Sequence, residues 1–89
     1  MSPNHLAEPD IFSVIGDARR RRIIELLAVK EHSVGELATT LGITQPSVTQ
    51  HLSALKDAGL VSREKRGTSS IYSLEREPLG QVKAWIKSL

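Results

Sequence analysis

Apolar residues recur at helical spacing through the first two thirds of the chain and again at its end. Near the N-terminus, apolar residues between positions 11 and 15 predict a short first helix that stops at Gly16. Asp17 can then cap a second helix that runs from about residue 18 to residue 30. The pattern therefore predicts two consecutive helices separated by a short break.

Two more short helices are predicted between residues 33 and 58. Ser33 and Glu36 have the spacing of a capping box, and Gly42 ends the helix that they start. Thr44 can cap the next helix, because its hydroxyl can accept a hydrogen bond from the first turn. The residues of that helix predicted to face the core are Val48, Leu52 and Leu55.

The remainder of the chain changes from helical to strand-like and back. Residues 60–74 contain two β-prone stretches around Gly67, which predicts a β-hairpin. Residues 78–89 place apolar positions along one seam and predict a terminal amphipathic helix. A tightly joined helix pair followed by a hairpin matches the helix-turn-helix plan with a wing. We therefore expect a mainly α fold with a small β-hairpin, a winged helix-turn-helix of element order α-α-α-α-β-β-α.

The length of the chain bounds its domain organisation. Eighty-nine residues are too few to fill two hydrophobic cores, so residues 1–89 are expected to form a single domain. Within it we assign the helix-turn-helix to residues 33–58, the wing to 60–74 and a terminal helix to 78–89, and we expect residues 1–7 to be a disordered tail. A core this small also favours association with a second copy.

The helix that starts at Thr44 has an unusual outward face. Residues 44–55 carry no formal charge, whereas solvated helix faces usually carry Glu, Lys and Arg. Hydroxyls and amides on such a face can reach base edges in a major groove, where a Gln amide can bond bidentately to adenine. We therefore predict a recognition helix for double-stranded DNA. Its candidate DNA-binding residues are Thr44, Gln45, Ser47, Thr49, Gln50, His51 and Ser53.

The hairpin adds the positive charge that the helix lacks. Its candidate DNA-binding residues are Arg63, Lys65 and Arg66, which can contact phosphates beside the hairpin tip. Cations also keep an edge hairpin soluble and unpaired, so this signal is weak by itself. The four arginines at 19–22 fan around their helix and cannot all face one ligand. His51 is left with two roles, a DNA contact or a partly buried imidazole bonded to the backbone.

Composition argues against several other functions. The chain has no cysteine, which excludes disulfides, thiolate metal sites and iron–sulfur clusters. His5, His32 and His51 lack the spacing of metal ligands, so neither a metal nor a cofactor is expected. No apolar run reaches the ~20 residues of a membrane helix, and the N-terminus lacks the features of a signal peptide, so we expect a cytoplasmic protein. No catalytic motif is present, so we do not expect an enzyme.

The segment TQPSVTQHLSALKDAGLVSREKRG, with the later IYSL, resembles the recognition helix and wing of the ArsR family of bacterial winged-helix repressors. GDARRRRIIELLA and SVGELATTLGI are similar to the segments that precede them, so the match covers roughly residues 9–89. The resemblance implies a homodimer that is bound to an inverted-repeat operator and paired through its first and last helices, which makes residues 78–89 a dimerisation helix. The terminal seam can instead pack against its own chain. The expected interface residues are Ile11, Phe12, Ile15, Leu79, Val82, Trp85, Ile86 and Leu89.

Departures from the family pattern point to its metal-independent branch. In HSVGEL, Ser33 and Gly35 stand where metal-sensing members have cysteines, and EREPLGQVKAWIKSL lacks the Asp and His of a second family site. PLGQVKAWI resembles members that often act as local repressors. We therefore predict a dimeric repressor of its own or a neighbouring operon, with an unknown effector. The alternatives are a winged-helix module that binds protein and, third, a metal-responsive repressor with nonstandard ligands.

Overall fold

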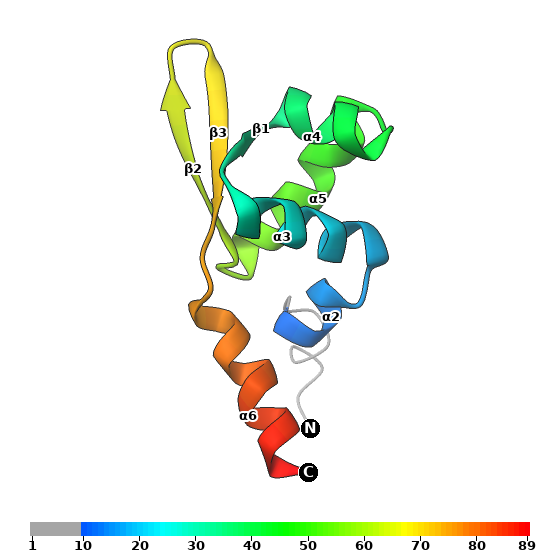
Figure 1. Cartoon of the computed structure of the whole chain (residues 1–89), viewed down its shortest axis with the longest axis vertical. Helices are drawn as coiled ribbons and strands as arrows, with labels where there is room; N and C mark the ends of the chain where they lie inside the picture. Colours follow the sequence, from blue (N-terminus) through cyan, green and yellow to red (C-terminus); the bar gives the residue numbers. More distant parts are fainter. Residues whose placement is uncertain (1–9) are drawn as a thin grey trace.

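The computed structural model describes residues 10–89 and arranges them as helices beside a small sheet (Figure 1). The predicted tail, residues 1–7, lies outside the described residues. The predicted element order is confirmed, with a short strand and a 3-10 turn, β1 and η1, added to it. In chain order the elements are α2 (Ile11–Ile15), α3 (Ala18–Val29), β1 (His32–Ser33), α4 (Val34–Leu41), α5 (Gln45–Asp57), β2 (Val61–Arg66), β3 (Ser69–Leu74), η1 (Glu77–Leu79) and α6 (Gly80–Ser88).

The junction between α2 and α3 is fixed by side chains that bond to backbone groups. The carboxylate of Asp17 accepts hydrogen bonds from the backbone N–H groups of Arg19 and Arg20, at 2.8 and 3.0 Å, which confirms it as an N-cap. The Nε of Arg20 donates to the carbonyl of Val14, and the Nη1 of Arg21 donates to that of Ile15, both at 2.7 Å. Two arginines of the run at 19–22 therefore satisfy the free carbonyls at the end of α2.

Local capping also determines the helix pair α4 and α5. The predicted capping box is present, because Ser33 and Glu36 exchange side-chain and backbone hydrogen bonds at 2.8 and 3.1 Å. The bond from the Ser33 backbone N–H holds the pKa of Glu36 below its ordinary value. Gly42 ends α4 with a left-handed φ of 68°, a conformation that costs a residue with a Cβ about 1 to 2 kcal/mol. Thr44 then caps α5. The inward residues of α5 are at most 1% exposed, as predicted: Val48, Leu52 and Leu55.

The sheet has three antiparallel strands in the order β1-β3-β2, one more than the predicted hairpin. β2 and β3 pair from Val61 opposite Leu74 to Arg66 opposite Ser69, and β1 adds His32 opposite Tyr72. The third strand makes His32 a buried residue whose Nδ1 lies 2.7 Å from the Lys30 carbonyl, instead of a loop residue. A strand of two residues is too short to show an alternating sequence pattern.

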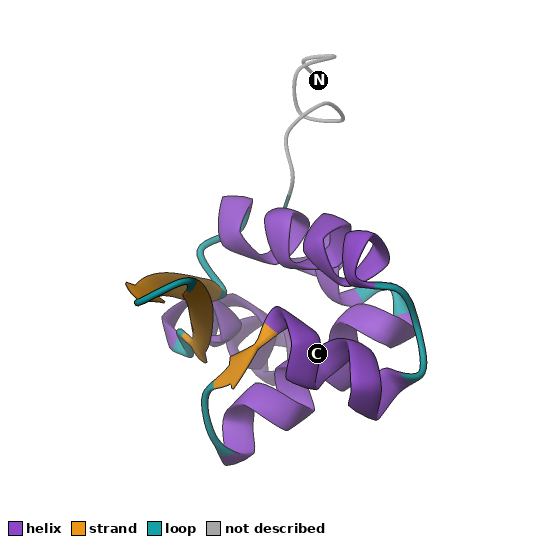
Figure 2. Ribbon diagram, turned by 90° about the horizontal axis from the view of Figure 1, so that it is seen from above, coloured by secondary structure: helices purple, strands orange, loops and turns teal. Residues whose placement is uncertain are grey.

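The C-terminal helix begins two residues later than expected. Pro78, the predicted start, lies in the 3-10 turn η1, and α6 begins at Gly80. Leu79 and Val82 pack partly against the core, whereas no residue of α6 is fully buried. Figure 1 shows α6 and the β2–β3 hairpin at opposite ends of the molecule, and Figure 2 shows these two strands at one side of the helices. The fold thus separates its basic hairpin from its terminal amphipathic helix.

Candidate nucleic-acid interface

The exposed face of α5 is polar and carries no charge from Gln45 to Leu55, and the charged Lys56 and Asp57 follow only at the end of the helix. Gln45, Thr49, Gln50 and Ser53 are exposed, while Ser47 and His51 are half-buried. The hydroxyl of Thr44 accepts a hydrogen bond from the backbone N–H of Ser47 at 3.3 Å, so part of its bonding capacity is used in capping the helix. Gln45 and Gln50 are the most versatile hydrogen-bonding residues on this face, because a carboxamide both donates and accepts.

The basic side chains of the wing differ in their surroundings. Arg63, Lys65 and Arg66 are all exposed on β2. Among residues 10–89, neither Arg63 nor Lys65 forms an ion pair. Arg66 forms two: its Nε lies 2.7 Å from Glu64 and its Nη1 lies 2.8 Å from Glu31. The bonds to Glu64 and then Glu31 raise the pKa of Arg66. Arg63 and Lys65 are therefore the wing cations with the greatest freedom to meet a phosphate.

A polar hollow of about 390 Å³ lies between α5 and the hairpin. Gln45 and Thr49 line it from α5, and Thr68, Ser69 and Ser70 line it from the hairpin turn and β3. Hydroxyl groups at this position can donate to phosphate or base oxygens, as those of α5 can. None of these three hairpin hydroxyls is among the residues predicted from the sequence, although the TSS segment directly after Gly67 was an available signal.

His51 lies on the side of α5 that approaches the start of α3. The backbone N–H of Arg20, followed by that of Arg19, holds the pKa of Asp17 below its ordinary value, and the charge of nearby His51 adds a smaller effect. Half-buried and close to this carboxylate, His51 has a neighbour within its own chain as well as an edge that solvent reaches. Both roles predicted for it stay open.

The eight residues expected at a dimer interface fall into two groups. Ile11 is 4% exposed and belongs to the core of its own chain, and Ile15, Leu79 and Val82 pack partly against that core. Four others form an exposed apolar surface: Phe12, Trp85, Ile86 and Leu89. The rings of Phe12 and Trp85 meet edge to face with centroids 5.7 Å apart, which joins α2 to α6.

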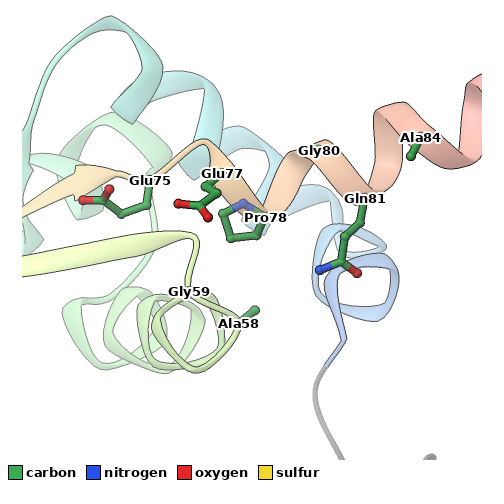
Figure 3. A pocket seen from close by; sticks show the side chains of 8 residues that line it. All are labelled: Ala58, Gly59, Glu75, Glu77, Pro78, Gly80, Gln81 and Ala84. Carbon is green, nitrogen blue, oxygen red and sulfur yellow. The ribbon is translucent and has the colours of Figure 1, made fainter.

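A larger hollow, about 700 Å³, lies away from the polar face of α5, between the end of α5 and the start of α6 (Figure 3). Glu75 and Glu77 are the charged residues among those that line it.

Over residues 10–89, no group of three or more His, Cys, Asp or Glu side chains is placed to hold a metal ion. No helix in the same range is long and apolar enough to cross a membrane.

Comparison with known proteins agrees with this geometry. Residues 17–63 match the family described as bacterial regulatory protein, arsR family. The regulator KmtR of Mycobacterium tuberculosis is 41% identical over 82% of this chain, which spans 56% of KmtR. The transcriptional repressor SdpR of Bacillus subtilis is 32% identical, with 86% of each chain covered. The homodimeric winged helix-turn-helix DNA-binding domain Mb0332 of Mycobacterium bovis has a TM-score of 0.70 at 31% identity, covering 84% of this chain and 69% of that one.

The fold and the family match together define a winged helix-turn-helix DNA-binding protein that regulates transcription. Within this class, the chain belongs to the arsR family of bacterial regulatory proteins. It is therefore a regulator and not an enzyme, as the sequence predicted. With no cysteine in the chain, it has no thiolate metal site.

Proposed function

We propose that the protein is a dimeric repressor that binds an inverted-repeat operator in its own or a neighbouring operon. The observation that carries this proposal is the exposed polar face of α5, uncharged from Gln45 to Leu55, beside a basic wing. In a two-fold dimer, two such helices enter successive major grooves about one helical turn apart. The protein would act in the cytoplasm, and when bound near a promoter it would exclude polymerase.

Phosphate contacts and base contacts have different roles at the proposed interface with DNA. Arg63 and Lys65 hold the wing to phosphates, which gives affinity without sequence preference. Gln45 and Gln50 discriminate base edges, with Thr49 and the other hydroxyls of α5 in support. A face without charge suits this role, because its hydroxyls and amides can bond base edges and it has no cation that phosphates would attract more strongly.

Dimerisation rests on the exposed apolar surface made by Phe12, Trp85, Ile86 and Leu89. Exposed large apolar side chains gathered on two adjoining helices are typical of an interaction surface. A second copy is the partner we assign to it, since a two-fold axis between copies would present two α5 helices to one operator. The homodimeric relative Mb0332 supports this assignment.

The proposal is tested by titrating the DNA upstream of the protein's own gene, and a scrambled duplex of equal length, by fluorescence anisotropy. We expect tighter binding to the native duplex. Gln50→Ala should weaken the binding free energy by about 1 to 3 kcal/mol on the native duplex and by little on the scrambled one. The matched control is Gln81→Ala, which removes an exposed amide from α6. Equal losses on both duplexes would contradict base reading by Gln50.

The alternative, a module that binds only protein, predicts no salt-sensitive binding to any duplex. Equal and weak binding to both duplexes would leave the DNA-binding class intact and place the operator elsewhere. No binding to either would favour the alternative. The recognition face argues against it, because protein-binding surfaces are enriched in aromatic residues, Met and Arg.

A further inference from the structure

Arg66 at the end of β2 is held by carboxylates from two separate parts of the chain. Glu64, two residues earlier on the same strand, binds its Nε at 2.7 Å. Glu31 binds its Nη1 at 2.8 Å and directly precedes β1, which is the strand at the opposite edge of the sheet. The ion pair between Arg66 and Glu31 therefore spans the sheet across β3 and ties the wing to the body of the domain.

These two carboxylates change the charge that the wing presents. Arg63, Lys65 and Arg66 supply three positive charges, and Glu31 and Glu64 supply two negative ones, so the local formal charge is +1. Both carboxylates are about half exposed, with side chains 43% and 59% accessible. Accessible carboxylates repel phosphates, and a guanidinium that is bonded twice has fewer free N–H groups to offer them.

We propose that Glu31, together with Glu64, restrains Arg66 and so sets the affinity of the wing for DNA of any sequence. Glu31 is a positioning residue that acts through Arg66. The proposal rests on the proposed contact between the wing and DNA phosphates. If edge protection were the only use of the wing charges, a carboxylate from the far edge of the sheet would not be needed to hold one of them. Release of Arg66 would add a phosphate contact and remove a repulsive charge.

The test compares Glu31→Gln with wild type on the scrambled duplex and on the native upstream duplex over a range of salt concentrations. One added phosphate contact makes the slope of log K against log salt steeper by about 0.9, which is about eightfold tighter binding at ~0.1 M salt and no gain near ~1 M. Because phosphates carry no sequence information, both duplexes should gain alike. An unaltered slope would overturn the proposal.

Two further variants separate this restraint from simple net charge. Glu25→Gln makes the same charge change at an exposed carboxylate that pairs with Arg22 on α3, and it should leave the slope unchanged. In an Arg66→Ala background, Glu31→Gln should lose most of its effect, since the side chain that it releases is gone. The proposal would be overturned if Glu25→Gln tightened DNA binding as much as Glu31→Gln does. It would also be overturned if Glu31→Gln tightened DNA binding fully in the Arg66→Ala background.

A measurement on the free protein distinguishes failure of this proposal from failure of the proposed function. The side-chain Nε–H of Arg66 should give a nuclear magnetic resonance signal that is more rigid than that of Arg63. Glu64→Gln and Glu31→Gln should each reduce the difference, and the double variant should remove it. An Arg66 signal as mobile as that of Arg63 would overturn the restraint while leaving DNA binding intact. A rigid Arg66 in a protein that binds no duplex would overturn both the proposed function and the control of DNA affinity.

Discussion

Replacing Trp85 by alanine should weaken the proposed dimer through loss of its largest exposed side chain. Trp85 is 52% exposed, with its ring edge to face against Phe12. A tryptophan side chain presents roughly 250 Å², so about 130 Å² stays available to a partner. Burying that area at ~25 cal/mol per Å² corresponds to about 3 kcal/mol per protomer as an upper bound.

The two-fold symmetry of a homodimer doubles the effect of each substitution. Ordering costs and the part of the surface that alanine retains reduce the loss to about 1 to 3 kcal/mol per protomer. Even the lower value, taken twice, weakens dimerisation by about 30-fold. Trp85→Phe, which keeps an aromatic ring at this position, should lose less.

Sedimentation velocity over a dilution series measures the dimer dissociation constant directly. Trp85 is the only tryptophan, so its emission reports on this surface alone and should shift to longer wavelength as the wild type dissociates. The control is Val29→Ala, which truncates an 82% exposed apolar side chain on α3 and should leave the constant unchanged. An unchanged constant in Trp85→Ala, or constant emission while the mass halves, would refute the assignment of α6 to the interface.

Two further predictions concern the caps of the helices. Gly42→Ala places a Cβ on a residue with φ of 68° and should lower the free energy of unfolding by about 1 to 2 kcal/mol in urea denaturation, whereas Gly80→Ala, in open helical backbone, should not lower it. The carboxylate of Asp17, whose pKa is depressed mainly by the backbone N–H of Arg20, stabilises the fold above about pH 4, and this contribution disappears as the pH falls through the folded-state pKa. Asp17→Asn keeps a helix cap but has no carboxylate to titrate, so its free energy of unfolding should fall less than that of wild type between pH 7 and acid. Parallel curves of unfolding free energy against pH for the two proteins would contradict this.

The helix boundaries that side chains or a glycine cap were predictable because caps are local, whereas the start of α6, which no side chain caps, lay two residues later than predicted. Asp17, Ser33, Thr44 and Gly42 each act within a few residues of the backbone groups that they satisfy or the turn that they form. The polar face of α5 was predictable for a related reason, since helical periodicity places every side chain relative to the buried ones. The candidate base-reading residues could therefore be found from the chain alone.

The sequence by itself thus determined the order of the helices, the ends that side chains cap, the uncharged polar face of α5 and the basic character of the wing. Only the tertiary structure decided which cations are free, because Arg66 meets Glu31 across a sheet from 35 positions away. The tertiary structure also decided the presence of β1, which exists only through pairing with β3. It likewise decided the place of Ile11, which is buried in the core and so is not available to the proposed interface. Local hydrogen bonds and helical periodicity depend only on residues close together in the sequence, whereas contacts between distant segments depend on how the elements pack.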